Sequence, residues 1–342
     1  MKATVSSRPH DGVDAAAAAR RLCRRGFVIA VVCAMVVACA VESEPDAPGS
    51  PADTVPAAAA AMPLPDLIVA ERGGFIPEGI EYDMANGRLL TGSLSEGTIF
   101  EIHPDGSVVP AVSDPDLVSS VGIEVDELRD RLLVANSDFA VFQNGAPGQA
   151  KLGVYNLASG DRIVMVDLAA AIPDAGADAA YFANDVVAAD DGAAYVTDTR
   201  MNLIYRVSPE YEASVLHRFD DGGAGPNGIV EHPAGYLLVA RGATLWKVPL
   251  DNPAGAVEVT LPEEIPGQDG MVWSAGRLAI VSSANRVVAL TSSDDWVTAD
   301  LAAAAGYDTP ATTAAVVGDD VYVVHPTFVG DDPPSFERVI FR

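Results

Sequence analysis

The chain has 342 residues, enough for one large domain or two ordinary ones. Its formal net charge is −27, from 48 acidic and 21 basic residues, and a surface this acidic argues against nucleic-acid and anionic-lipid partners. Hydrophobic residues make up 49% of the chain, which favours a folded core over an acidic disordered protein. The three cysteines all lie within the first 39 residues, so the rest of the chain has no disulfide and no thiolate metal site.

Residues 1–39 are predicted to be an export signal. The basic segment RRLCRR (20–25) precedes an uncharged apolar run from Phe27 to Ala40, which is short for a membrane span. That run contains VVAC (36–39), which resembles a bacterial lipobox with Cys39 as the lipidated first mature residue. An uncleaved anchor is the alternative. Both readings place the protein outside the cytoplasm, either as a membrane-anchored lipoprotein or as a secreted or periplasmic protein.

Residues 40–63 are rich in Pro, Ala and acidic residues and show no hydrophobic periodicity, so they are predicted to be a disordered linker. From residue 64 to 342 a short motif recurs, in which one apolar strand is followed by a turn and a second apolar strand. The second strands are anchored at Leu89, Leu132, Tyr195, Leu237, Leu278 and Val321. Neighbouring anchors are 41 to 43 residues apart, except for 63 between the second and third.

Short alternating strands that repeat every forty-odd residues, with Gly-containing turns between them, are typical of propeller blades. Six repeats predict an all-β, six-bladed propeller over residues 64–342. The segments 65–71 and 336–342 are spare strands that could join the two ends of the ring. The long gap reflects two insertions, at roughly 138–150 and between residues 161 and 183, which are expected beside the site described next and could form a lid over it.

Oxygen-bearing side chains stand at equivalent places in four of the repeats, 9 to 11 residues before the anchor. These residues are Glu78, Asn184, Asn227 and Asp269; Val121 and Thr312 hold the same place in the second and sixth repeats. In a propeller these positions begin the innermost strands and converge on the axis. Two carboxylates in a narrow tunnel repel each other unless a cation binds between them. All-oxygen donors suit a hard ion, and Ca²⁺ fits better than Mg²⁺, although another divalent cation is an alternative.

The segments PEGIEYD, ANDVVAADDG, PNGIVEHPAG and QDGMVWSAG resemble the metal-binding loops of the gluconolactonase and senescence-marker-protein (regucalcin-like) family. The resemblance implies a six-bladed propeller with a central calcium ion that hydrolyses lactones or related esters. It implies metal-ligand roles for Glu78, Asn227 and Asp269, and it places Asn184 near both metal and substrate. Asp269 would also be the catalytic base or nucleophile. Because Gly79 replaces the acid that a second calcium site requires in paraoxonase-like relatives, we expect one ion.

Sugar-lactonase members of that family carry an arginine just before the Asn-Asp pair, where this chain has Tyr181-Phe182-Ala183. This change argues against a sugar lactone. We expect Asn184, Tyr181, Phe182 and Thr312 to line the pocket of a small-molecule substrate. We also expect a monomer that meets the membrane only through an N-terminal lipid. The rival interpretation is a non-catalytic propeller lipoprotein that binds a protein or small ligand and uses its metal only structurally.

Overall fold

The computed structural model describes residues 64–341 except 144, 177 and 221. The predicted export signal with Cys39 and the predicted linker lie outside the described residues. The described chain forms 25 β-strands and four short 3-10 helices, η1 (Glu127–Arg129), η2 (Phe139–Phe142), η3 (Ala169–Ala171) and η4 (Pro253–Gly255). No helix in this part of the chain is long and apolar enough to cross a membrane.

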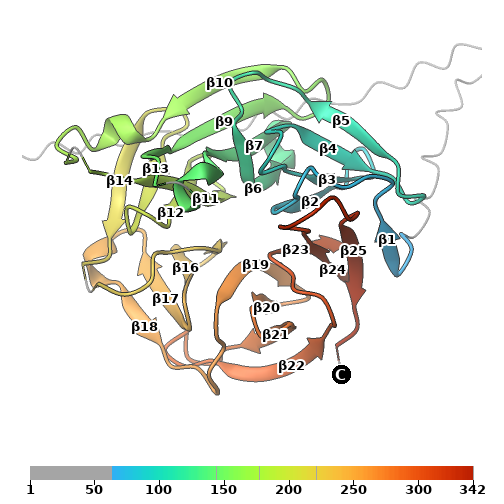
Figure 1. Cartoon of the computed structure of the whole chain (residues 1–342). Coiled ribbons are helices and arrows are strands. Elements are labelled where there is room, and N and C mark those ends of the chain that lie inside the picture. The colour runs from blue at the N-terminus through green and yellow to red at the C-terminus, as the bar shows by residue number, and fades with distance from the viewer. Residues whose placement is uncertain (1–63, 144, 177, 221, 342) are drawn as a thin grey trace, which may run out of the picture. The chain divides into compact units, whose positions relative to one another are not determined.

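The strands form six sheets around a central axis, so the predicted all-β, six-bladed propeller is confirmed (Figure 1). Blade one comprises β2 (Ile80–Asp83), β3 (Arg88–Thr91), β4 (Ile99–Ile102) and β5 (Val108–Val112). Blade two comprises β6 (Ser119–Asp126), β7 (Arg131–Ser137), β9 (Lys151–Asn156) and β10 (Arg162–Asp167). Blade three comprises β11 (Tyr181–Ala188), β12 (Ala194–Asp198), β13 (Leu203–Val207) and β14 (Ala213–Arg218), with β8 (Gly148–Gln149) in parallel beside β11.

Blade four comprises β15 (Ile229–His232), β16 (Tyr236–Arg241), β17 (Thr244–Pro249) and β18 (Val257–Val259). Blade five comprises β19 (Gln268–Ser274), β20 (Arg277–Ser282), β21 (Arg286–Thr291) and β22 (Asp300–Gly306). Blade six comprises β23 (Ala314–Val317), β24 (Asp320–His325), β25 (Ser335–Val339) and β1 (Leu67–Val69). In each blade the first strand in this order is innermost and the last lies at the rim.

The ring is closed by the two spare strands. β1, from the start of the domain, pairs antiparallel with β25, with Ile68 opposite Phe336. Both of these side chains are buried in a cluster shared by blades six and one. Blade six is therefore built from both ends of the domain, and the two ends lie side by side in Figure 1.

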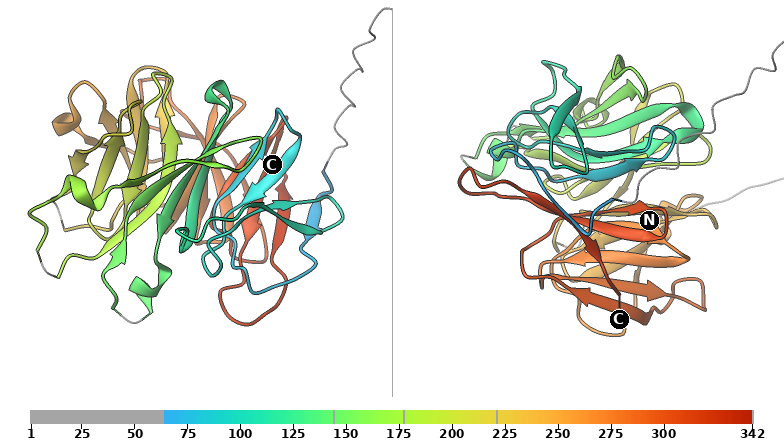
Figure 2. Two further views of the ribbon diagram at one scale, coloured as in Figure 1. Left: turned by 90° about the horizontal axis from the view of Figure 1, so that it is seen from above. Right: turned by 90° about the vertical axis from the view of Figure 1, so that its right-hand side faces the viewer.

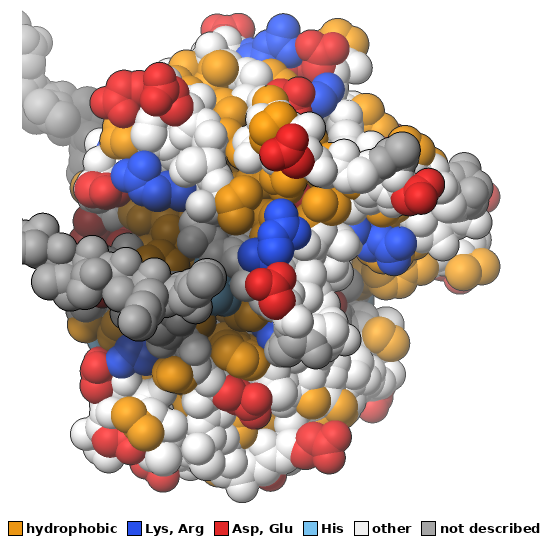
Figure 3. Space-filling view, turned by 90° about the vertical axis from the view of Figure 1, so that its left-hand side faces the viewer, with side chains coloured by type: hydrophobic (Ala, Val, Ile, Leu, Met, Phe, Trp, Pro, Cys, Tyr) orange, Lys and Arg blue, Asp and Glu red, His pale blue; other side chains and the backbone are white. Residues whose placement is uncertain are grey.

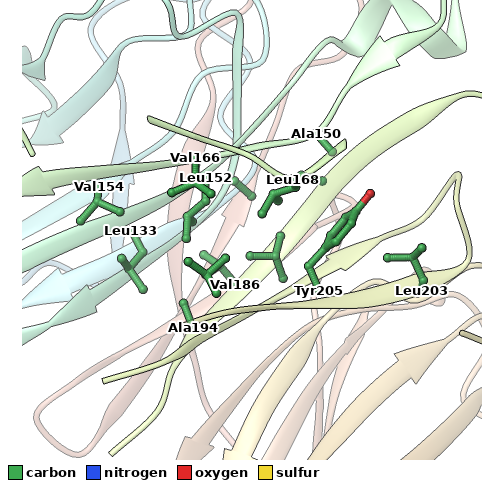
Figure 4. Packing of buried hydrophobic residues seen from close by; sticks show 14 residues of the cluster. Leu133, Ala150, Leu152, Val154, Val166, Leu168, Val186, Ala194, Leu203 and Tyr205 are labelled. Carbon is green, nitrogen blue, oxygen red and sulfur yellow. The ribbon is translucent and has the colours of Figure 1, made fainter. Parts of the chain in front are cut away.

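The core lies between neighbouring blades. The second strands of the blades are the most deeply buried, and every residue of β7, β12 and β16 is buried because a sheet covers each face. Figure 4 shows the interface of blades two and three, where Leu133 and Val154 of one sheet face Val186 and Tyr205 of the other. Each sheet thus buries its apolar residues against the next, which is why the repeats need one another to fold.

The propeller has two faces, which Figure 2 shows edge-on. We call the face at which the innermost strands begin the upper face, and the face at which they end the lower face. β7 and β24 run toward the upper face, so the insertion at 138–150 and the loop at 326–334 both emerge there. The residues between β10 and β11 cross the same face.

Candidate metal centre and its cavity

Bulges at the upper ends of the innermost strands set the positions of the site residues. In blades two, three and five the register with the second strand shifts at Val121-Gly122, Asn184-Asp185 and Asp269-Gly270. A bulge adds a residue that is not paired in the ladder and re-aims its side chain. Two of the predicted ligands, Asn184 and Asp269, are therefore held where the ladder no longer fixes the side chain to one face of the sheet.

Hydrogen bonds between blades tie these positions into a ring. The Gly79 N–H donates to the Val121 carbonyl at 3.1 Å, and the Gly270 N–H donates to the Thr312 carbonyl at 2.9 Å. The Thr312 hydroxyl in turn donates to the Glu78 carbonyl at 2.9 Å. Blades one, two, five and six are thereby joined at the level of the predicted ligands, and the backbone around them has little freedom.

Blades three and four are joined by a carboxylate instead. Asp185, the residue after Asn184, accepts hydrogen bonds from the Val186 N–H at 2.9 Å and from the Ile229 N–H at 3.1 Å. The Thr197 hydroxyl adds a bond to the Asn227 carbonyl at 2.7 Å. Asp185 thus acts as a connector between the blades that carry Asn184 and Asn227.

The structure brings the four predicted ligands together at the upper end of the axis. Glu78, Asn184, Asn227 and Gly270 line one cavity, and Asp269, the residue before Gly270, lies close to the Asn227 side chain. The Asn184 Nδ2 donates to the Thr199 hydroxyl at 2.8 Å. This bond directs the Asn184 Oδ1 away from Thr199. Burial, and then the charge of Asp269, holds the pKa of Glu78 well above its usual range.

The cavity has a volume of about 520 Å³ and runs from this ring to the hairpins of the lower face, where Met84, Pro233 and Trp273 line it. Seven carboxylates line it, and none of its described lining residues is a Lys, Arg or His. These carboxylates are Glu78, Glu81, Glu124, Glu127, Asp185, Asp190 and Glu231. A cavity with this lining attracts cations and repels anions.

Sequence reasoning missed the carboxylates in the middle of this cavity. Burial, and then the charge of Asp185, raises the pKa of Glu81 to about 8, and burial followed by the charge of Glu81 raises the pKa of Glu124. A signal was available: Glu81 and Glu124 both lie eight residues before their blade anchors, Leu89 and Leu132. Equivalent positions in two blades face the same tunnel.

The donor set fits a hard cation. The ring of predicted ligands offers two carboxylates and two amides. Among the described residues no group of three or more His, Cys, Asp and Glu side chains could hold a metal ion, so the two amides would have to complete the site. Burial raises the pKa values of Glu78 and Asp269, that of Asp269 to about 7, because no cationic side chain compensates them. A bound divalent cation would supply the missing charge, and oxygen donors suit calcium.

An aromatic cap, which we define as Phe139, Phe142, Phe182 and Phe328, covers part of the upper face. Phe139 of η2 stacks on Phe328 of the blade-six loop, with ring centroids 6.3 Å apart. Phe142 meets Phe182 edge-on at 4.7 Å. Phe182 and Val141 are buried in one cluster with Val121, the ring position of blade two. The first insertion therefore lies over the blade-two side of the ring.

The other predicted pocket residues have different surroundings. Phe182 is only 4% exposed beneath the insertion, whereas Phe142 and Phe328 are each 48% exposed. Tyr181 pairs with Gly148 and packs against the core between blades two and three. Thr312 is buried, and its hydroxyl is engaged with Glu78. Substrate contact by Tyr181, Phe182 and Thr312 stays a prediction, and Phe142 and Phe328 present the exposed aromatic surface.

No family model matches this chain, and no curated protein matches its sequence. Solved structures do match its fold. The Malassezia sympodialis allergen Mala s 1 aligns with a TM-score of 0.65 and 18% identity, over 81% of this chain and 97% of the allergen. A regucalcin from Agrobacterium tumefaciens, described as calcium-binding, aligns with a TM-score of 0.56 and 19% identity, over 80% and 96% of the two chains.

A gluconolactonase from Xanthomonas campestris aligns with a TM-score of 0.55 and 15% identity, over 82% of this chain and 99% of that chain. The chain therefore has the six-bladed propeller fold of the gluconolactonase and regucalcin proteins, as its loop motifs implied. At these identities the likeness shows the fold, and the activity has to be argued from the site.

Proposed function

We propose that the protein is a calcium-dependent hydrolase of a lactone or related ester that acts outside the cytoplasm, held there through Cys39 or released. The observation that carries this proposal is the ring of two carboxylates and two amides at the end of a cavity whose described lining residues include seven carboxylates and no basic side chain. The fold shared with a gluconolactonase and a calcium-binding regucalcin supports it.

Glu78, Asn184, Asn227 and Asp269 would hold the ion. When bound, a hard cation polarises a carbonyl oxygen and stabilises the negative charge that develops on it. The Asp269 carboxylate, beside Asn227, would accept a proton from water or attack the carbonyl carbon itself. Asp185 fixes the strands that carry Asn184 and Asn227. The aromatic cap offers apolar surface and favours a less polar substrate than a sugar lactone.

The test is metal analysis of the full-length protein, paired with hydrolysis of lactones and aryl esters before and after chelation. We expect one equivalent of calcium and activity that chelation removes and calcium restores. Glu78→Gln should weaken calcium binding by 10-fold or more, because a ligand charge is lost. Glu96→Gln is the matched control, since Glu96 pairs with Arg72 at the surface, and it should change neither.

Asp269→Asn separates catalysis from metal binding, because the amide keeps an oxygen donor but cannot accept a proton. We expect calcium to be retained in large part and turnover to be lost. Calcium binding without hydrolysis of any substrate in the wild-type protein would favour the non-catalytic propeller. No bound metal after calcium is added back would overturn the proposal.

A further inference from the structure

Two carboxylates in the middle of the cavity are not part of the proposed metal centre. Glu81 of β2 and Glu124 of β6 both line the cavity below the ring of predicted ligands. Among the described residues no side chain donates a hydrogen bond to either carboxylate and no Lys, Arg or His pairs with it, although the backbone of Tyr82 lies close to one and that of Ala188 to the other. Calcium at the ring would neutralise the ring carboxylates and leave this pair without a counter-charge.

The carboxylates nearer the lower face differ, because backbone donors already occupy them. Glu127 Oε1 accepts hydrogen bonds from the Met84 N–H at 2.7 Å and from the Ala85 N–H at 3.2 Å. Glu231 Oε2 accepts one from the Asp190 N–H at 3.3 Å. These bonds join the hairpins of neighbouring blades, so these two carboxylates have a structural task that the pair in the middle of the cavity lacks.

Blades one and two hold Glu81 and Glu124 side by side. The Gly79 N–H donates to the Val121 carbonyl at 3.1 Å, and a Cβ at residue 79 would overlap both that carbonyl oxygen and the Ile123 nitrogen. The two innermost strands run in the same direction from this contact, which brings the two glutamates to neighbouring places further toward the lower face. Two adjacent carboxylates attract one positive charge more strongly than either does alone.

The cavity around this pair is larger than a metal ion needs. Its volume of about 520 Å³ is many times the roughly 30 Å³ that a water molecule occupies in the liquid. No group of three or more His, Cys, Asp and Glu side chains could hold a metal ion among the described residues, so the pair is not completed by a third such ligand. Apolar side chains share the wall with it, including Ile123, Val125 and Val187. A cation with a hydrocarbon body matches this wall better than a bare ion does.

Trp273 adds a rigid aromatic surface to the same wall at the lower face. Its Nε1 donates to the Glu231 carbonyl at 2.8 Å, and its ring meets that of Trp296 edge-on, with centroids 5.7 Å apart. Trp296 is itself only 4% exposed, which fixes the arrangement. An indole held in this way offers flat apolar surface to a ligand, and its ring attracts a nearby ammonium group.

We propose that the part of the cavity below the ring binds an organic ammonium ion, with its charged head between Glu81 and Glu124 and its hydrocarbon body along the apolar wall toward Trp273. The head of a primary amine carries three N–H donors, so it can bond to both carboxylates at once. The negative lining of the cavity attracts such a cation. This binding site goes beyond the proposed hydrolase function and does not depend on it.

The test is calorimetric titration of the calcium-loaded, full-length protein at about pH 8. The probes are 2-phenylethylamine and n-hexylamine, each compared with its neutral counterpart, 2-phenylethanol or 1-hexanol. We expect amine binding, and at least about 10-fold weaker binding of the alcohol, because only the ammonium group interacts with the carboxylate charge. Glu81→Gln and Glu124→Gln should each weaken amine binding by about 10-fold or more. Their melting temperatures should be unchanged or higher, since a neutral amide needs no counter-charge.

The matched control is Glu127→Gln, which removes one charge from the same cavity. Its amide oxygen can still accept the hydrogen bonds from the Met84 and Ala85 N–H groups. We expect amine binding to weaken by no more than about 3-fold, because this residue contributes only a more distant charge. Equal losses in all three variants would show that the total charge of the cavity holds the amine, and would overturn the site between Glu81 and Glu124.

A wild-type protein that binds neither amine would overturn the inference, and so would one that binds each amine and its alcohol equally. A second equivalent of calcium, removed by Glu81→Gln and by Glu124→Gln, would assign the pair to a metal ion and would also overturn it. Hydrolysis is measured in parallel. Amine binding by a protein that hydrolyses nothing would support this inference and end the hydrolase proposal, whereas hydrolysis without amine binding would do the reverse.

Discussion

The Thr312 hydroxyl donates a 2.9 Å hydrogen bond to the Glu78 carbonyl, 234 residues earlier in the chain. This contact joins the last blade to the first at the level of the candidate metal centre. It fixes the backbone of the residue that supplies one of the two ring carboxylates. The same bond therefore links the first and last blades and holds the backbone of a site residue.

Thr312→Val removes that hydroxyl and keeps the shape of the side chain. We expect a loss of about 1 kcal/mol in the free energy of unfolding, because the buried Glu78 carbonyl loses a donor. Weaker calcium binding should accompany it. Urea denaturation and calcium calorimetry measure the two effects. Thr312→Ser is the control and should behave almost as wild type; equal losses in both variants would show that the hydroxyl is not responsible.

Gly79→Ala tests the close approach of blades one and two. A Cβ at residue 79 would overlap the Val121 carbonyl oxygen, which is backbone and cannot move aside cheaply. We expect a destabilisation of about 1–3 kcal/mol by urea denaturation, as for other overpacked positions. Gly176→Ala is the matched control, because nothing lies within 4 Å of its added Cβ and its φ is not positive. A variant at residue 79 as stable as that control would contradict the proposed packing.

The calcium-free protein should lose stability as pH rises. Burial, and then the charge of Asp185, raises the pKa of Glu81 from 4.5 to about 8. Between these values the folded state keeps a proton that the unfolded state releases, so the stability that Glu81 contributes below pH 4.5 is lost by about pH 8. We expect the melting temperature in chelator to fall across this window, and to fall less in Glu81→Gln. A rise in melting temperature from pH 5 to 8, or an identical slope in the variant, would contradict this assignment.

Phe328→Ala tests whether the two upper-face loops support each other. Loss of the stacking on Phe139 removes about 0.5–1.5 kcal/mol of local interaction. We expect faster amide hydrogen exchange in residues 139–143, with little change in global stability, because Phe328 is half exposed. Val329→Ala is the control, since Val329 is 88% exposed. Unchanged exchange in the first insertion would mean that the two loops are independent.

Surface charge is a separate matter from the charge of the cavity. On the side of the molecule formed by blades three and four, acidic side chains are spread between basic and apolar ones (Figure 3). The concentration of carboxylates that distinguishes this protein is inside, along the axis. The composition gives the number of acidic residues, but it does not show which of them face solvent and which face the tunnel.

The repeat spacing determined the fold, because a propeller has a local period: each blade is a run of consecutive antiparallel strands, and its innermost strand begins at a fixed distance from an anchor such as Leu89. For the same reason the convergence of Glu78, Asn184, Asn227 and Asp269 could be read from their offsets. Glu81 and Glu124 could also have been predicted, because each lies at the same distance before its blade anchor. However, a carboxylate inside an alternating strand looks like a solvent-facing residue until the tunnel is known.

Other features depend on contacts between residues far apart in the chain, and these have no local pattern. The burial of Phe182 follows from where the first insertion folds back, and the pairing of Phe139 with Phe328 follows from where a loop of blade six meets it. The lack of a counter-charge at Glu81 and Glu124 among the described residues depends on the side chains that every neighbouring strand places along the axis. Sequence determined the blades and the ring of ligands because both repeat; only the tertiary structure decided what covers that ring and which of the described carboxylates below it are left without a counter-charge.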